Sequence, residues 1–283
     1  MISYVKRKDL DVVKYNACIK NSLQSRIYAF SWYLDVVAEN WDVLVFKDYE
    51  AVMPIPWKRK FRIKYITQPP FCQQLGIFFL QEFNETKELL FLKKVKRSFL
   101  KINYAFNSDN FKNDNKNIRI NYILPLNNDY EFLFKDFNKG RKHAVKKAMK
   151  NNLSLGNISV KQILKLQKEN YHYEGFRSQV LAKLIPTLLE LEKAEMLAVY
   201  QHEKLLGATV FLKDENRIYY LFAAFNNIGK SLQAPSFVIN KIISTYAKSN
   251  LLLDFEGGNI TSIGRFFKSF GAKEEIFCQL KRF

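Results

Sequence analysis

Residues that build easily recognised sites are scarce in this sequence of 283 residues, which has three cysteines, three histidines and ten glycines. Cys18, Cys72 and Cys278 are widely spaced and form no C-x-x-C pair, so neither a disulfide framework nor a structural zinc site is expected. The histidines are scattered without metal-ligand spacing, and the sequence has no Ser/His/Asp or H-E-x-x-H arrangement. We therefore predict no bound metal and no covalent nucleophile.

Long hydrophobic runs are also missing. No apolar run reaches the roughly 18 residues that span a bilayer. The first eight residues, Met1–Lys8, lack the apolar segment of a signal peptide. The sequence therefore predicts a soluble, cytoplasmic protein with no transmembrane segment.

Basic residues, by contrast, are abundant. The 45 Lys and Arg outnumber the 27 Asp and Glu, which gives a net charge of +18. The excess is uneven, because residues 1–150 contain 28 basic and 15 acidic side chains. Such a charge favours anionic partners: an anionic small-molecule donor or acceptor, tRNA, or a membrane surface contacted peripherally. An ordinary solvated lysine-rich surface is the alternative interpretation.

Composition and length indicate a globular protein of two domains, since 48% of the residues are hydrophobic and 15% aromatic. In the first half, helical spacing alternates with short β-prone runs that read as an antiparallel meander. The expected elements are a helix over 28–40, strands over 41–46, 51–57 and 62–67, a helix over 85–100, and strands over 102–106 and 118–126.

The second half opens with a helix over 138–151 that carries a basic stripe, Lys139, Lys142, His143, Lys146 and Lys150. After it the pattern predicts two helices, three strands, a helix, a strand, a helix and a last strand. The helix near residue 260 has Asn259 as its expected N-cap. The expected ranges are helices 160–171, 178–191, 234–248 and 259–270, and strands 196–201, 205–213, 217–225, 251–255 and 275–280.

Three segments carry a resemblance to a known superfamily: Arg141–Lys150, the D-F-E-G run Asp254–Gly257, and the F-x-x-x-F-G-A run Phe266–Ala272. Together with the element order, they resemble the Fem-type, peptidoglycan-bridge branch of the GNAT acyltransferases. The resemblance implies an α/β (α+β) fold of two tandem GNAT-like domains, with mixed, largely antiparallel sheets flanked by helices. We place these domains at 1–137 and 138–283.

The resemblance also implies a donor site between a strand and the helix that contains Pro235. The run 226–231 is a degraded form of the GNAT pyrophosphate loop (Q/R)-x-x-G-x-(G/A), in which backbone N–H groups at a helix start hold phosphates. The expected donor is an acyl-CoA or a charged tRNA, with no tightly bound cofactor. A plain strand-to-helix loop is the alternative. The expected donor-binding residues are Asn226, Gly229, Lys230, Ser231 and Leu232.

Two residues are candidates for proton transfer. Asp254 and Glu256 alternate along one strand, so both side chains are expected on the same face. Glu256, next to the glycine turn, is the candidate general base, whereas Asp254 is expected to bind a backbone group or an arginine. Tyr220 is a candidate proton donor. Loop or cap formation by Glu256 and core packing of Tyr220 are the competing interpretations.

Gln73 and Gln74 are expected to contact a polar substrate, because amides recognise polar ligands without carrying charge. Arg265 is expected to pair with Glu256 or a ligand phosphate, or to lie on the surface.

These residues predict an N-acyltransferase or aminoacyltransferase that moves an acyl group to an amine by direct attack. The alternatives are a basic nucleic-acid-binding protein and a catalytically inactive member of the fold. The sequence names neither the acceptor nor the oligomeric state.

Overall fold

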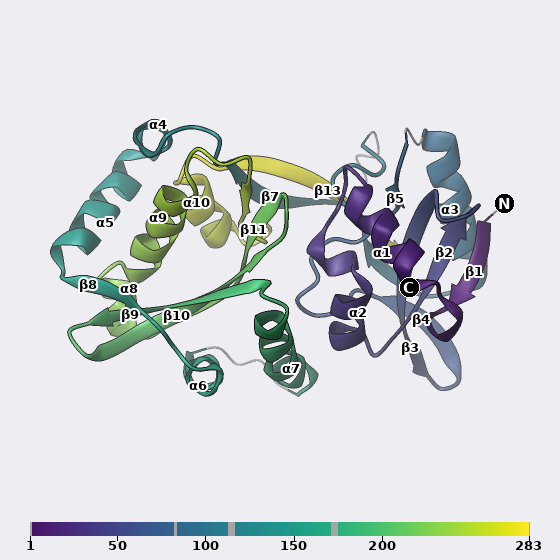
Figure 1. Ribbon diagram of the computed structural model, residues 1–283, viewed down its shortest axis with the longest axis horizontal. Helices are drawn as coiled ribbons and strands as arrows, with labels where there is room; N and C mark the ends of the chain where they lie inside the picture. Colours follow the sequence, from purple (N-terminus) through teal and green to yellow (C-terminus); the bar gives the residue numbers. More distant parts are fainter. Residues whose placement is uncertain (1, 82–83, 113–116, 171–174, 283) are drawn as a thin grey trace. The chain divides into compact units, whose positions relative to one another are not determined.

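The computed structural model describes residues 2–81, 84–112, 117–170 and 175–282 (Figure 1). Contacts between backbone atoms divide the chain into two compact units. The first unit is Met1–Arg119 with Ile276–Phe283, and the second is Ile120–Glu275. Both units combine helices with a mixed sheet, which confirms the predicted fold class. Within the described residues, no helix is long and apolar enough to cross a membrane.

The first unit contains a largely antiparallel sheet in the order β1-β2-β3-β4-β6-β13, with β5 paired to β3. The β4–β6 pair is parallel. Helices α1 and α2 pack on β2, β3 and β5. The elements are β1 (Ile2–Lys6), α1 (Val12–Asn21), α2 (Ser31–Val37), β2 (Asn40–Phe46), β3 (Ala51–Lys60), β4 (Ile63–Thr67), β5 (Phe78–Phe79), α3 (Glu85–Ser98) and β6 (Ile102–Ala105).

Two prolines lie inside β3, where they would usually interrupt a ladder. The backbone nitrogen atoms of Pro54 and Pro56 face the same edge of the strand, because the two residues are two positions apart. The carbonyl of Pro54 accepts a hydrogen bond from the Tyr104 hydroxyl at 2.9 Å. The missing N–H of Pro54 faces that same side, between the residues that pair with β5 and those that pair with β4. The missing N–H groups therefore remove no hydrogen bond between β3 and β2.

The second unit has the sheet order β7-β12-β11-β10-β9-β8, in which β11 and β12 are parallel. The chain passes between units inside β7 and again inside β13. The elements are β7 (Ile118–Pro125), α4 (Tyr130–Lys135), α5 (Lys139–Lys150), β8 (Leu153–Gly156), α6 (Val160–Asn170), α7 (Phe176–Glu190), β9 (Ala194–Gln201), β10 (Lys204–Lys213), β11 (Arg217–Phe225), α8 (Asn227–Ser231), α9 (Ala234–Tyr246), β12 (Leu252–Asp254), α10 (Thr261–Lys268) and β13 (Lys273–Arg282).

Helices cover both faces of this second sheet, with α5, α9 and α10 on one side and α6 and α7 on the other (Figure 1). The first of these layers encloses an aromatic core. Phe255 stacks on Phe267 with ring centroids 4.7 Å apart, and Phe137 meets Phe270 edge to face at 5.2 Å. Burial of such rings is a major source of stability, since each removes a large apolar area from water.

A half-buried arginine completes the contact between α5 and α10. The guanidinium of Arg141 lies 4.3 Å from the Phe266 ring centre and 4.6 Å from that of Phe270. It also donates hydrogen bonds to the hydroxyls of Ser269 and Ser236. Burial lowers the pKa of Arg141 to about 10, so the side chain stays charged at neutral pH. The first residue of the Arg141–Lys150 motif therefore has a structural role.

The two units repeat one pattern of strand pairing. In each, three antiparallel strands (β2-β3-β4 and β9-β10-β11) are followed by a strand parallel to the third. The expected division at residues 137 and 138 differs from the two compact units in two places. Residues 120–137 belong to the second unit, because β7 pairs with β12, and residues 276–283 belong to the first, because β13 pairs with β6.

Several local features differ from the expectations. The sequence pattern missed β1, α1, β5, α4, β8 and α8, and helix α2 is shorter than the expected 28–40. Asn259 is not the N-cap of α10, because its side chain exchanges hydrogen bonds with the backbone of Ile120 instead.

Candidate functional site

The parallel strands β11 and β12 separate in the middle of the second unit. Their pairing covers Arg217–Tyr219 and Leu252–Asp254, and within the described residues β11 continues to Phe225 with β10 as its strand partner. A β-bulge lies at the point of separation, because Val210 pairs with Phe222 and Phe211 with Tyr220. Leu221 is thus the extra residue, and its N–H is displaced from the regular ladder.

A buried ionic cluster lies directly before this separation. Arg217 donates to Asp254 Oδ2 at 2.8 Å and to the two oxygens of Glu275 at 2.7 and 3.1 Å. Asn121 Nδ2 donates to the same two carboxylates at 2.8 and 3.1 Å. These side chains come from four strands, β11, β12, β13 and β7, so the cluster fixes their mutual register.

The cluster contains two carboxylates and one guanidinium, all nearly inaccessible to solvent. Burial raises the pKa of Asp254, and this effect outweighs the Arg217 charge, which acts in the opposite direction. For Arg217, burial lowers the pKa, but the two carboxylates outweigh burial and raise it. Each member therefore depends on the others to remain charged out of water.

The same cluster holds the turn that follows β12. The N–H of Glu256 donates to Asp254 Oδ1 at 3.0 Å, and the N–H of Gly257 donates to Asn121 Oδ1 at 3.1 Å. Glu256 has φ of 53°, a left-handed conformation that is costly for a residue with a side chain. The expected alternation of Asp254 and Glu256 along one strand is wrong, because β12 ends at Asp254. The Glu256 side chain is half-buried.

The adjacent glycines are explained by packing. A Cβ on Gly258 would lie 2.7 Å from the carbonyl oxygen of Ile120 and 2.9 Å from the Tyr122 ring. A Cβ on Gly257 would lie 3.5 Å from Phe267, which is ordinary contact. Gly258 is therefore required by the close approach of the turn to β7.

Tyr219 and Tyr220 lie on opposite faces of β11. The Tyr220 ring packs between Phe211 and Phe267, with centroids 5.3 and 6.0 Å away, and is half-buried. Tyr219 is fully buried and its hydroxyl donates to Asp214 at 2.7 Å. Of the two, Tyr220 is the one that faces the aromatic core beside the strand separation.

The expected donor-binding residues surround the short helix α8. Asn226 caps this helix, because its Oδ1 accepts the N–H of Gly229 at 2.7 Å. A Cβ on Gly229 would lie 2.6 Å from the carbonyl oxygen of Leu206, so this glycine permits close packing on β10. Lys230 and Ser231 are exposed, and the carbonyl of Leu232 accepts Asn151 Nδ2 at 3.2 Å.

The expected substrate contacts lie apart along the chain. Gln74, in the first unit, is buried; its Oε1 accepts the N–H of Ser108 at 3.1 Å, and its Nε2 donates to Gln73 Oε1 at 2.9 Å. Arg265 is exposed on α10. The structure therefore gives Gln74 a scaffolding role in its own unit.

The first unit differs from the second where its parallel strands separate. The β4–β6 pairing ends at Thr67 and Asn103. Beyond it, Gln68 Oε1 accepts the N–H of Ala105 at 3.0 Å, and the N–H of Leu75 donates to the Ala105 carbonyl at 2.9 Å. The first unit's own chain thus bonds to the edge of β6.

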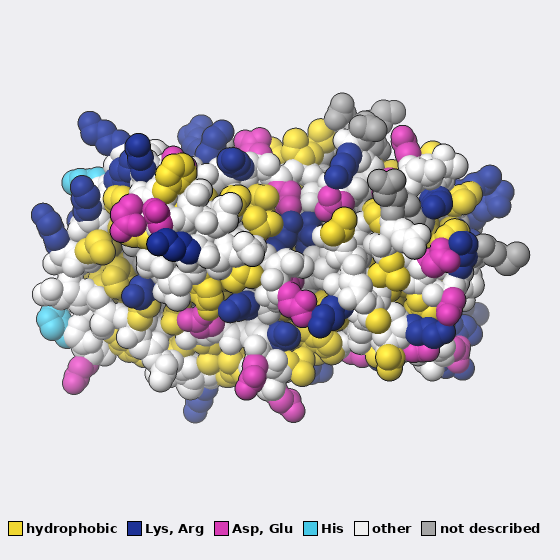
Figure 2. All heavy atoms as spheres, turned by 45° about the horizontal axis from the view of Figure 1, so that its top comes forward, with side chains coloured by type: hydrophobic (Ala, Val, Ile, Leu, Met, Phe, Trp, Pro, Cys, Tyr) yellow, Lys and Arg dark blue, Asp and Glu magenta, His cyan; other side chains and the backbone are white. Residues whose placement is uncertain are grey.

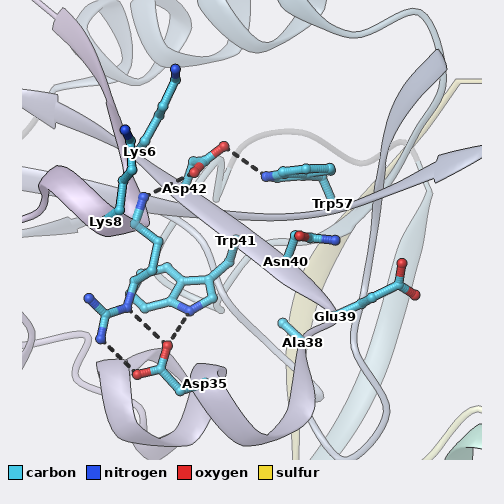
Figure 3. A pocket seen from close by; sticks show the side chains of 10 residues that line it. Lys6, Lys8, Asp35, Ala38, Glu39, Asn40, Trp41, Asp42 and Trp57 are labelled. Carbon is cyan, nitrogen blue, oxygen red and sulfur yellow. Dashed lines mark hydrogen bonds and ion pairs between the residues drawn. The ribbon is translucent and has the colours of Figure 1, made fainter. Parts of the chain in front are cut away.

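A pocket of about 400 Å³ lies elsewhere in the first unit, beside β1 and β2 (Figure 3). Two of its acids, the buried Asp42 and the exposed Asp35, are bound by neighbouring groups. Asp42 accepts from the Tyr4 hydroxyl and Trp57 Nε1, both at 2.7 Å, and Asp35 accepts from Arg7 and from Trp41 Nε1 at 2.8 Å. The pocket is therefore lined by a self-contained network. Within the described residues, no group of three His, Cys, Asp or Glu is placed to hold a metal.

Sequence patterns did not identify Arg217, Glu275, Asn121 or the bulge at Leu221. Arg217 is the first residue of β11, and Glu275 lies in a strand with four other charged residues, so neither stands out in the sequence. Nothing in the sequence marks Asn121 or the bulge, because both depend on the partner strand.

Comparison with known proteins extends the fold assignment. No protein-family model and no curated protein sequence matches the chain. Among solved structures, FemX is similar with a TM-score of 0.69, 11% identity and coverage of 95% of each chain. A tandem GNAT protein from the clavulanic acid biosynthesis pathway has a TM-score of 0.58 and 9% identity, and covers 100% of this chain and 99% of its own.

A third similar structure is the C-terminal domain of a putative lysylphosphatidylglycerol synthetase from Agrobacterium fabrum. It has a TM-score of 0.59 and 8% identity, and covers 96% of this chain and 91% of its own. The chain therefore has the GNAT fold in a Fem-like two-domain architecture, as the sequence motifs predicted.

The glycine turn offers a matched pair of substitutions. Gly258→Ala should lower the free energy of unfolding by about 1–3 kcal/mol, because the new methyl group meets the backbone of β7. Gly257→Ala, one residue away, should change it by less than about 1 kcal/mol. Urea unfolding of the two purified variants measures both values, and equal losses would contradict this account of the turn.

Arg217→Met removes the only cation of the cluster. We expect a loss of about 3–5 kcal/mol at neutral pH, because Asp254 and Glu275 stay buried without compensation. Without Arg217 the pKa of Asp254 rises further, so the folded state binds a proton more tightly than the unfolded state. Stability is then retained at low pH and lost as pH rises. Urea unfolding at pH 4 and pH 7 should show the smaller deficit at pH 4, whereas Arg265→Met should show little deficit at either.

Proposed function

We propose that the chain is an N-acyltransferase or aminoacyltransferase that moves an acyl group from an acyl-CoA or a charged tRNA to an amine. The observation that carries this proposal is the separation of β11 from β12, with a bulge at Leu221 on β11 and Glu256 in the turn that follows β12. This arrangement offers an N–H donor and a base at the same end of the parallel pair.

The proposed reaction is direct attack. The amine nitrogen bonds to the acyl carbon, and the oxyanion that develops is stabilised by the displaced N–H of Leu221. Glu256 accepts the proton that the amine loses. The C–S bond of a thioester, or the C–O bond of an aminoacyl ester, then breaks. Tyr220 supplies a proton to the departing sulfur or oxygen.

Donor binding is proposed at the strand-to-helix connection after β11, with Asn226, Gly229, Lys230, Ser231 and Leu232. The exposed Lys230 ammonium is available to the phosphates of a donor. The N–H of Gly229 is already bound by Asn226, so it contributes through packing and not through a hydrogen bond to the donor. No tightly bound cofactor is proposed.

The second unit is favoured as the donor unit over the first. In the first unit, the chain from Gln68 to Leu75 bonds to β6 beyond the parallel pairing. In the second unit, the pairing of β11 with β12 ends at Tyr219 and Asp254, and the turn after β12 is held by Asp254 and Asn121. Arg265 remains a proposed substrate contact. Gln73 is a better proposed contact than Gln74, which is buried.

An inactive member of the fold is the second candidate. It is favoured by α8, where Asn226 and Gly229 are explained by capping and packing alone. A basic nucleic-acid-binding protein is compatible with the same fold. A cytoplasmic location fits a donor of either kind and stays part of the proposal.

Glu256→Gln tests the base directly. Turnover with the cognate amine should fall by about a hundredfold or more, because the amide accepts no proton. The turn should persist, since it is held through the backbone N–H of Glu256. Glu203→Gln, on an exposed turn, is the matched control and should keep full turnover. Unchanged turnover in Glu256→Gln would contradict the proposed role of this residue.

Donor binding is measured by calorimetric titration with acetyl-CoA, longer acyl-CoAs and free CoA at moderate salt. We expect dissociation constants on the order of micromolar. Lys230→Ala should weaken binding about two- to fivefold, the range for an exposed cation, while Lys204→Ala should not. If no CoA species binds wild-type protein, the donor is a charged tRNA or the inactive alternative is correct.

A further inference from the structure

Helix α5 has an exposed face on which lysine side chains predominate. Its twelve residues, KGRKHAVKKAMK, include five lysines and no acid. Val145 and Ala148 are buried, and Arg141 turns inward to the two phenylalanines, so the lysines occupy the outward side. Figure 2 shows Lys and Arg side chains gathered at the edge where Figure 1 places α5.

This face is not neutralised by the protein itself. Within the described residues, no ion pair joins an α5 side chain to an acid; the Lys142 ammonium donates to the backbone carbonyl of Lys135 instead. Lys146 has Lys142 and Lys150 four residues away on either side, and like charges at this spacing destabilise a helix. The charge is therefore kept against a local cost, which a polyanionic partner would remove.

The side chains distinguish between classes of polyanion. The outward face uses lysine, a flexible point charge, together with the exposed His143, and contains no outward arginine and no Phe, Tyr or Trp. Planar arginine forks and aromatic stacking surfaces are the usual means of gripping nucleic acids. The exposed apolar side chain on the helix is Met149, at its C-terminal end, with 60% of its surface accessible. Clusters of four to eight basic residues on an amphipathic helix fit mobile anionic lipid headgroups.

We propose that α5 is a docking surface for an anionic phospholipid membrane. The lysines lie along a line of about 17 Å, the length of twelve residues at helical rise, and contact headgroup phosphates. Met149 enters the boundary between headgroups and acyl chains. This surface is independent of the proposed acyl-transfer site.

The test is sedimentation of the full chain with vesicles of phosphatidylcholine containing roughly one-third phosphatidylglycerol, at about 0.1 M salt. The variant Lys139/Lys146/Lys150→Glu leaves Lys142 unchanged, because its ammonium group donates to the backbone carbonyl of Lys135. Its partition onto these vesicles should fall by roughly two orders of magnitude. Wild-type protein should not bind vesicles of phosphatidylcholine alone.

The matched control is Lys93/Lys94/Lys96→Glu, which makes the same charge change on exposed positions of α3. Its partition onto the anionic vesicles should fall by less than about fivefold, because it alters only the overall charge of the protein. Equal losses in the two variants would overturn the proposal, as would wild-type protein that ignores anionic vesicles. Binding of a structured RNA that depends on the α5 lysines, without vesicle binding, would assign the face to nucleic acid and also overturn it.

Discussion

The ionic cluster of Arg217, Asp254 and Glu275 is the constraint on which the second unit depends. A buried ion pair rarely stabilises a fold more than well-packed apolar side chains would, because removal of the charges from water is costly. Its value here is geometric: the guanidinium and Asn121 have fixed donors that tie four strands together at one level. A slip of any strand by one residue would leave a charge unpaired in the core, so the cluster selects one register.

That register determines where the chain can leave the sheet. Asp254 is the last residue of β12, and its second oxygen binds the N–H of Glu256, while Asn121 binds the N–H of Gly257. These bonds hold Glu256 in a left-handed conformation that it would not adopt alone. Glu256, whose backbone is strained, is also the proposed general base. Strained residues are concentrated at functional sites, where the surrounding structure holds them in place.

Sequence patterns predicted the large elements because hydrophobic periodicity is strong in them: the meanders of both units and helices α3, α5 and α9 follow their expected ranges closely. The tandem GNAT architecture was also predicted, through motifs such as Asp254–Gly257. The patterns failed where a partner decides the outcome. Asn259 looks like an N-cap, but the backbone of Ile120 competes for its side chain. The bulge at Leu221 depends on how β11 pairs with β10. The burial of Arg217 depends on two acids that are distant in the sequence, Asp254 and Glu275.

The repeated strand pairing makes the contrast between the units informative. Both units place a parallel strand beside the third strand of a meander, so both create a point where two strands part. In the first unit, Gln68 and Leu75 satisfy the backbone of Ala105 at this point, and Gln74 bonds the following loop through Ser108. In the first unit, hydrogen bonds within the unit therefore occupy the point where the two strands part. The second unit instead has a bulge on β11 and the left-handed Glu256 after β12, and it is this asymmetry, more than the shared fold, that argues for a single reaction site in the second unit.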